Sequence, residues 1–520
     1  MKALASTKLD PLAAVPSHLR TRIVSGMRWT LWLSVLASPL GYATTILLAR
    51  VGPEAIGTYG LLIVYLGVVS GLIYLGGDAV AIKFIPELES DKRIAFVCSY
   101  FLVTCLTLGP WIAAAALWPE WLRHLFGGNI AAPYEVLLIC LAPIHIAFCL
   151  VVAVLKGLLE IRWAQIMLRA ITVGSFLIYG ALFIFDRRLL SAHYTELIWS
   201  VYLGLATIEA MLGVRHLVRL TAWKGGWRRL RFFLPYGFWR YTLSTQQVSA
   251  LRFFTDRLDL LLVLNFGGLA VLGKYVAIRT LAEIIQVSNR FLTLDTLLPS
   301  LTNVLASRDR TAASQIMSVN LRVLFLANAA TTCGLMFLAG PITSLLGPRY
   351  ASVSELFVLM VLFLGLSEPI NLGATLLSSV GKQQRAVWVR LGQIGLYVFL
   401  FFSLWPRGQL LGAIIANGVA MLLSNAVLLV VARRSTDVHF SWGRDYLAFA
   451  SVGVASFLLA RHWLPVPLSL ALVASMVSWG TFLLIGRFTI SECRALIGCF
   501  LPVGGRSLPE VLEGNTGFPQ

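Results

Sequence analysis

Long hydrophobic runs, separated by short polar connections, fill almost the entire chain. A membrane-spanning helix needs about 20 predominantly apolar residues, and the runs reach that length. The pattern therefore predicts an all-α, polytopic membrane protein with about 14 transmembrane helices. We expect these helices at residues 27–49, 58–80, 94–117, 133–155, 164–185, 196–214, 235–266, 269–301, 313–338, 353–380, 386–405, 410–431, 446–463 and 468–485.

Composition supports this class of fold and indicates how the chain crosses the bilayer. Hydrophobic residues make up 58% of the 520 residues, charged residues 13%, and the mean hydropathy is +0.80, which excludes an ordinary soluble domain. The net charge of +18 does not indicate a nucleic-acid partner, because of where the basic residues lie. If the N-terminus is cytoplasmic, 26 of the 42 Lys and Arg fall in cytoplasmic segments and 7 in the opposite loops. This asymmetry follows the positive-inside rule and predicts that both termini are cytoplasmic.

An internal repeat organises the chain. Gly57 and Tyr59 align with Gly273 and Tyr275 at an offset of 216 (275 minus 59), and three later landmarks repeat at offsets of 213, 220 and 224. A nearly constant offset predicts duplication of a six-helix unit, and an even helix number gives parallel repeats. We expect a cytoplasmic leader (1–26), a six-helix bundle (27–214), a basic cytoplasmic hinge (215–234), a second six-helix bundle (235–431), an extra helix pair (432–486) and a cytoplasmic tail (487–520).

Charged residues inside spans seven and eight point to a polar interior. A charge at mid-membrane costs roughly 2.5 to 3.5 kcal/mol on insertion scales, so it usually faces a partner or a water-filled cavity. At helical spacing, two faces carry these charges. One face holds Arg279, Glu283, Gln286 and Arg290, and the other holds Arg252, Asp256 and Asp259, with Gln247 on a neighbouring face. We interpret them as the lining of a central chamber.

Several segments together resemble a known family. They are GPEAIGTYGLL from Gly52, GGDAVAIKFIPEL from Gly76, TDRLDLLLV from Thr255, GKYVAI from Gly273 and LLGPRYASVSELFVLM from Leu345. In order and spacing, over roughly residues 25 to 435, they resemble the Wzx-type lipid-linked oligosaccharide flippases of polysaccharide biosynthesis. These flippases belong to the multidrug, oligosaccharidyl-lipid and polysaccharide exporter (MOP) superfamily.

The resemblance implies a flippase that moves undecaprenyl-pyrophosphate-linked oligosaccharide repeat units across the bacterial inner membrane by alternating access. The polymer would be O-antigen, capsule or exopolysaccharide. Expected partners are the lipid-linked substrate, membrane lipids, and a polysaccharide polymerase with its chain-length machinery. The extra helix pair resembles that of the lipid II flippases, but their start motif, with paired arginines after Pro-Asn, is missing. The alternatives are a lipid II flippase and a cation-coupled multidrug exporter.

If the cargo carries a pyrophosphate, particular side chains have expected roles in binding it, and the main candidates also have a simpler structural explanation. Arginine pairs with phosphate oxygens through its planar fork, so Arg279, Arg290, Arg252 and Arg50 are the pyrophosphate candidates, with Gln286 and Gln247 for sugar. The alternatives are intrahelical ion pairs of Arg252 with Asp256 and Arg279 with Glu283, and an interfacial, snorkelling Arg50. The ion-coupling candidates are Asp78, Asp256, Asp259, Glu283, Glu368 and His145, of which Glu368 and His145 lie beside prolines.

Other chemistry lacks its motifs in this sequence. There is no GxxxxGK[ST] segment, so direct ATP coupling is not expected. The seven cysteines lack metal-ligand spacing, so we expect no metal and no cofactor. The short outer loops leave no room for the catalytic groups of a membrane polymerase or ligase, and we expect no enzymatic activity.

Overall fold

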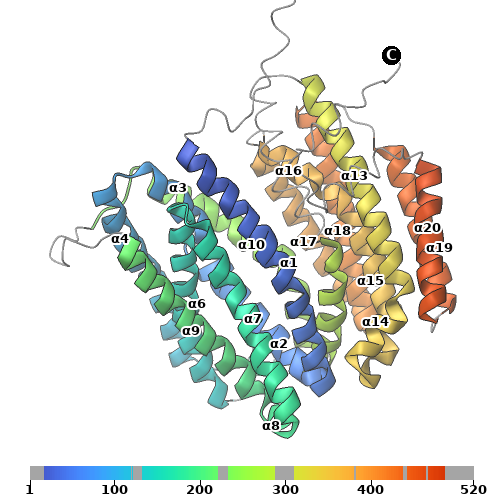
Figure 1. Ribbon diagram of the computed structural model, residues 1–520, viewed down its shortest axis with the longest axis horizontal. Coiled ribbons are helices and arrows are strands. Elements are labelled where there is room, and N and C mark those ends of the chain that lie inside the picture. Colours follow the sequence, from blue (N-terminus) through green and yellow to red (C-terminus); the bar gives the residue numbers. More distant parts are fainter. Residues whose placement is uncertain are drawn as a thin grey trace, which may run out of the picture. The chain divides into compact units, whose positions relative to one another are not determined.

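The described residues form helices and connecting turns, with no strand among them (Figure 1). The computed structural model describes residues 17–118, 120, 124, 132–220, 232–286, 310–379, 382–436, 438, 442–463 and 467–486. They divide into two compact units, Met1–Ala277 and Ile278–Gln520. The predicted all-α, polytopic class is therefore confirmed.

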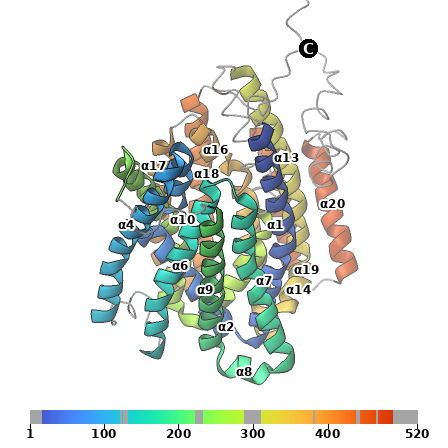
Figure 2. The ribbon, with the colours of Figure 1, turned by 60° about the vertical axis from the view of Figure 1, so that its left-hand side comes forward.

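Long antiparallel helices build the first unit. In chain order they are α1 (Ser17–Val51), α2 (Pro53–Val68), the π-helix η1 (Val69–Ile73), α3 (Gly77–Glu87), α4 (Ser90–Leu117), α6 (Ala132–Gly157), α7 (Ile161–Phe185), α8 (Arg187–Ala192), α9 (Tyr194–Leu220) and α10 (Phe238–Ala282), whose last five residues belong to the second unit. Helix α7 packs along α1, and α6 packs against both α3 and α9 (Figure 2). Pro53 begins α2, where its missing N–H leaves no bond unmade.

The second unit continues with helices that are interrupted twice by short 3-10 turns. They are α13 (Arg310–Phe337), α14 (Ala339–Leu346), η4 (Pro348–Val353), α15 (Ser354–Ser367), η5 (Pro369–Asn371), α16 (Leu372–Ser379), α17 (Gln383–Gly408), α18 (Leu410–Thr436), α19 (Gly443–Trp463) and α20 (Leu468–Gly486). The turn at η5 lies where the Glu368–Pro369 step predicts a kink, because proline cannot continue the hydrogen-bond ladder.

Twelve helical segments of the described residues are long and apolar enough to cross a membrane. One of them, residues 238–286, is 49 residues long, or about 74 Å at 1.5 Å per residue, more than twice a bilayer core of about 30 Å. Gly268, with φ 74° and ψ −178°, breaks it into two crossings. The 21-residue α19 is not among the twelve, so the predicted count of about 14 is approximate.

The second predicted span is not one continuous helix, which corrects the expectation for residues 58–80. Helix α2 widens into η1 and stops, and α3 starts after a turn at Gly76 and Gly77. Both glycines have positive φ, 72° and 58°, a conformation that costs glycine little and other residues more. At Gly76 a Cβ would also lie 2.9 Å from Thr242 Cγ2. Two adjacent glycines therefore create a break that the hydrophobic pattern alone does not reveal.

The two repeat-equivalent glycines, Gly57 and Gly273, lie against each other where α2 crosses α10. A Cβ at Gly273 would lie 2.7 Å from Pro53 C and 2.9 Å from Gly57 N, and a Cβ at Gly57 would lie 2.8 Å from Leu269 C. Such distances are tighter than real Cβ contacts, so only glycine allows this approach. The duplication of a six-helix unit stays a prediction.

The helices after the second predicted bundle pack on the second unit. Helices α19 and α20 lie against α13, and α19 also contacts α15. Arg322 of α13 forms an ion pair with Asp445 at the start of α19, 3.4 Å from Nε to Oδ2. The Asp445 side chain is only 9% exposed. The predicted domain boundary, residues 215–234, falls partly outside the described residues, and the division into six, six and two helices stays a prediction.

Candidate functional site

Arg279 and Glu283, the first residues named for the predicted chamber, form an ion pair. Arg279 Nε lies 2.9 Å from Glu283 Oε1, with the side chains 17% and 32% exposed. This is the intrahelical pairing that sequence analysis gave as the alternative. Gln286 is half-buried one turn further on, and its backbone N–H donates to the Glu283 carbonyl at 2.9 Å. Arg290 lies outside the described residues, so its role remains a prediction.

The second charged face, on the first segment of α10, is much more open. Arg252 Nε lies 3.4 Å from Asp256 Oδ2, and their side chains are 79% and 50% exposed. Gln247 is exposed one turn earlier. Arg50, at the end of α1, is also exposed, and its carbonyl accepts a hydrogen bond from Arg187 Nη2 at 3.1 Å.

Asp259 differs from these residues because it is deeply buried and bound to protein groups. It is 4% exposed. The Tyr275 hydroxyl donates to Asp259 Oδ2 at 2.6 Å, and the Leu260 N–H donates to Oδ1 at 2.9 Å. The Asp259–Tyr275 bond connects the two segments of α10 across the break at Gly268. A carboxylate held in this way is well placed to stabilise the fold, and it is also the most enclosed of the acidic candidates for ion coupling.

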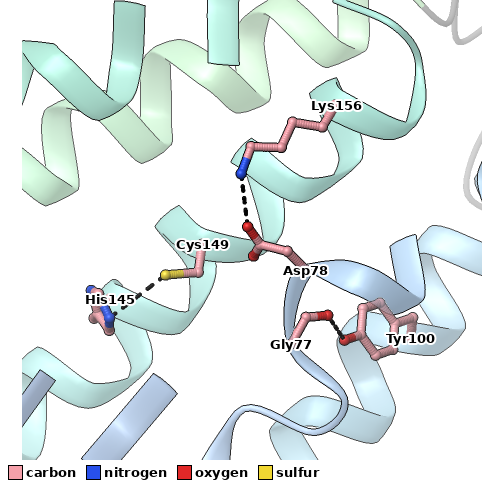
Figure 3. A network of polar contacts seen from close by, with 6 residues as sticks. All are labelled: Gly77, Asp78, Tyr100, His145, Cys149 and Lys156. Atoms are coloured by element: carbon pink, nitrogen blue, oxygen red, sulfur yellow. Dashed lines mark hydrogen bonds and ion pairs between the residues drawn. The ribbon is translucent and has the colours of Figure 1, made fainter. Parts of the chain in front are cut away.

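A polar network lies inside the first unit, around Asp78 and His145 (Figure 3). Asp78 Oδ2 forms an ion pair with Lys156 Nζ at 2.9 Å, and both side chains are partly exposed. His145 is 7% exposed, and both of its ring nitrogens have partners. Nε2 lies 2.7 Å from the Ser70 hydroxyl, and Nδ1 lies 2.8 Å from the Tyr202 hydroxyl. Sequence analysis singled out Asp78 and His145 but not these hydroxyl partners.

Gln246, which sequence analysis passed over in favour of its neighbour Gln247, stabilises the break between α2 and α3. Its amide nitrogen donates to the carbonyls of Gly71 and Leu72 at 3.0 and 2.9 Å, and its carbonyl oxygen accepts from the Gly76 N–H at 2.8 Å. These backbone groups lack the usual helical partners at an interruption. The adjacent Gly76 and Gly77 indicate a helix break in the sequence. Such a break requires a polar side chain that forms hydrogen bonds with the backbone groups it leaves unpaired.

In the second unit, polar groups gather beside η5. Glu368 is half-buried at the α15–η5 junction. Arg390 of α17 donates from Nη1 to Gln393 Oε1 at 2.6 Å and from Nη2 to Asn371 Oδ1 at 2.7 Å. Asn425 of α18 donates to the Ser367 carbonyl at 3.0 Å. The Arg390–Asn371 and Asn425–Ser367 bonds connect neighbouring helical segments, whereas the Arg390–Gln393 bond lies within α17.

The chemistry that this arrangement allows is binding and charge exchange. Across the described ranges, no three His, Cys, Asp or Glu side chains are grouped so that they could hold a metal ion. Some charged groups of the described residues form ion pairs, on single helices or between neighbouring ones, and Arg252 and Asp256 are accessible enough to change partners. Such groups suit recognition of an anionic or cationic cargo.

Comparisons with known proteins bear on the fold alone. No family model matches the sequence, and no curated protein matches it significantly. Among solved structures, the chain is similar to the lipid II flippase MurJ in an inward closed conformation. The TM-score is 0.64 at 11% identity, over 88% of this chain and 98% of that chain.

Other transporters of known structure also share the fold. An inward-facing multidrug resistance MATE family transporter gives a TM-score of 0.58 at 12% identity, over 77% of this chain and 94% of that one. A MOP superfamily transporter from Pyrococcus furiosus gives 0.51 at 14% identity, over 81% and 95%. This multi-pass membrane protein therefore has the fold of the MOP superfamily transporters.

Proposed function

We propose that the protein is a flippase that carries undecaprenyl-pyrophosphate-linked oligosaccharide repeat units across the bacterial inner membrane by alternating access. The observation that carries the proposal is the similarity to the lipid II flippase over 98% of that chain. The multidrug resistance MATE family transporters cover 77% and 81% of this chain, against 88% for the flippase. That neighbour's name states lipid II as its cargo, and a lipid-linked, phosphate-bearing cargo would account for the arginines within apolar spans of this chain.

The exposed pair on α10 is suited to receive an anionic group. Ion pairs as open as Arg252–Asp256 contribute about 0.2 to 1 kcal/mol, because water screens both charges. A guanidinium binds phosphate oxygens through two parallel, charge-assisted hydrogen bonds that are roughly twice as strong as neutral ones. A pyrophosphate can therefore displace Asp256 from Arg252 at small cost, which makes Arg252 a first contact for the cargo.

The enclosed pair is suited to couple cargo binding to another cation. Arg279 and Glu283 are closer together and less exposed than Arg252 and Asp256, so water screens their attraction less. A pyrophosphate that binds Arg279 leaves Glu283 open to a proton or a metal cation. After the cargo leaves on the outer side, the cation moves inward on Glu283, so the ion gradient drives the return of the empty carrier.

Polysaccharide export in the native cell tests the assignment. We expect Arg279→Ala to abolish export while the protein stays in the membrane at the wild-type level. Arg433→Ala, which removes an exposed arginine at the end of α18, is the matched control and should export normally. Normal export in Arg279→Ala would contradict the role of this arginine.

The multidrug-exporter alternative makes a different prediction for the same cells. An exporter of cationic drugs would raise resistance to cationic dyes when it is overproduced. The flippase proposal predicts no such gain in resistance, because the arginines of α10 repel cations. A broad gain in dye resistance, without any effect on polysaccharide, would favour the exporter.

A further inference from the structure

One face of α6 carries a line of polar side chains through the interior of the first unit. His145, Cys149 and Lys156 are spaced by four and seven residues, which keeps them on the same side of the helix. Cys149 Sγ lies 3.6 Å from His145 Nε2, and Lys156 pairs with Asp78 of α3 (Figure 3). The line therefore leads from a partly exposed ion pair to a buried imidazole.

The partners of His145 fit both protonation states of the ring. A neutral imidazole donates from one nitrogen and accepts at the other, whereas an imidazolium donates from both. Ser70 and Tyr202 present hydroxyls, which can either donate or accept, at 2.7 and 2.8 Å from the ring nitrogens. A proton can thus bind the free lone pair of the ring if one hydroxyl turns from donor to acceptor.

Polar groups continue from His145 toward bulk water. The Asp78 side chain is 39% exposed and is the most accessible end of the line. The buried Tyr74 hydroxyl lies close enough to Tyr100, Asp78 and Cys149 to interact with them electrostatically. Tyr74 follows η1 directly. A proton taken up at Asp78 therefore has polar groups along its way to the imidazole.

Few other titratable groups in the described helices face this cluster. Helix α7 directs Arg169 to Ser34 of α1 instead, and Glu209 lies two turns beyond Tyr202 on α9. The titratable side chains at the cluster are Tyr59 of α2, Tyr74, Asp78 of α3, Tyr100 of α4, Cys149 and Lys156 of α6, and Tyr202 of α9.

We infer that His145 is a proton-binding site and that proton uptake there drives the movement of η1 away from α6. This inference deepens the proposed function, because a coupling proton is useful to a carrier. The proton comes from bulk water and binds one ring nitrogen, and no other bond is made or broken. Ser70 lies within η1, so its hydrogen bond is the direct mechanical link between the ring and the moving segment.

The direction of the coupling follows from burial. A charged imidazole enclosed by apolar helices is costly without a counter-charge beside it, so the closed arrangement holds the neutral ring. Proton binding favours an arrangement in which water reaches the ring. The open arrangement, in which water reaches the ring, binds one proton more than the closed arrangement. The ratio of open to closed molecules therefore changes by up to about tenfold per pH unit and rises as the pH falls.

Hydrogen–deuterium exchange of the full chain in lipid nanodiscs tests this coupling. The reporter is the peptide that covers η1 and the Gly76–Gly77 turn, with rates corrected for the intrinsic pH dependence of amide exchange. In the wild type, we expect exchange to rise by up to about tenfold per pH unit as the pH falls from about 6.5, the ordinary value for histidine, towards about 4, because burial opposes charging of the ring. His145→Gln, which keeps hydrogen bonding but cannot titrate, should abolish this pH response.

A control variant and a second measurement keep the inference falsifiable. His193→Gln removes a histidine that is 58% exposed between α8 and α9 and should retain the wild-type response. Nitrogen-15 spectra of labelled histidine in the wild type should show a ring, identified by its loss in His145→Gln, that becomes an imidazolium over the same range. A ring that stays neutral, or a pH response that survives in His145→Gln, would overturn the inference.

The proton site and the proposed cargo can fail separately. If the protein carries a different cargo, the exchange and nitrogen-15 responses of His145 remain. If His145 does not bind a proton, a flippase still moves lipid-linked oligosaccharide, but without the pH response that depends on this ring.

Discussion

Replacing Gly273 with alanine tests whether the close crossing of α2 and α10 determines how these helices pack. The added Cβ would lie 2.7 Å from Pro53 C and 2.9 Å from Gly57 N, and closer still to Pro53 O. An ordinary van der Waals contact begins at 3.4 Å, so the helices must separate by at least 0.7 Å (3.4 minus 2.7). The obstructing atoms are backbone, which cannot turn aside as a flexible side chain could.

The expected cost combines overpacking with a small gain in helix propensity. Inserting a group into a well-packed contact costs typically 1 to 3 kcal/mol, whereas alanine favours a helix over glycine by about 1 kcal/mol. We therefore expect Gly273→Ala to destabilise the protein by roughly 1 to 2 kcal/mol. Gly395→Ala in α17 is the matched control. It has no atom within 4 Å of the new Cβ and should be neutral or stabilising.

Reversible unfolding in mixed micelles measures both variants against the wild type. Because Gly57 and Gly273 share one contact, the double alanine variant should cost less than the two single variants added together. A Gly273→Ala protein that is as stable as Gly395→Ala would refute the close crossing. Full additivity of the two substitutions would show that the glycines do not meet.

Three further substitutions test contacts that the structure reveals. Gln246→Leu should destabilise the break between α2 and α3 by about 1 to 3 kcal/mol, the cost of leaving buried backbone groups unpaired. The control, Gln247→Leu at an exposed position, should change stability by less than about 0.5 kcal/mol. Equal effects of the two substitutions in unfolding assays would count against the role of Gln246. Asp445→Ala leaves Arg322 without its carboxylate and should lower the stability by up to about 3 kcal/mol. The readout is faster proteolysis of α19 and α20. An unchanged cleavage pattern would mean that the Arg322–Asp445 pair does not hold these two helices in place. Tyr275→Phe keeps the ring but leaves buried Asp259 short of a donor, so we expect a loss of about 1 to 3 kcal/mol, and a stability equal to wild type would show that this bond contributes nothing.

Much of the architecture could be predicted from hydrophobicity alone. Apolar runs of spanning length fix the helices, and Pro369 marks the interruption of the tenth span, because proline removes a backbone donor. The sequence also singled out Gly57 and Gly273, although their contact, where only glycine fits, is visible in the structure alone. The helices and the interruption at Pro369 follow from local rules, so the sequence contains the information directly.

Pairing inside the membrane is harder to predict, because it depends on which faces of distant helices meet. Arg279 and Glu283 are four residues apart in the sequence, so this helical spacing alone predicts their ion pair. The partners of His145 come from η1 and α9, and no spacing in the sequence relates them. Gln246 and Gln247 are adjacent and chemically identical. Only the position of the α2–α3 break determines which of the two forms hydrogen bonds with its backbone.

Reconstituted transport tests the central claim most directly. The purified protein is placed in liposomes that carry a fluorescent undecaprenyl-pyrophosphate-linked oligosaccharide, and a quencher outside reports movement between leaflets. We predict rapid exchange of this lipid in wild-type vesicles, and exchange at the rate of protein-free vesicles with Arg279→Ala. Wild-type vesicles that leave the lipid in its original leaflet but move cationic dyes would contradict the account.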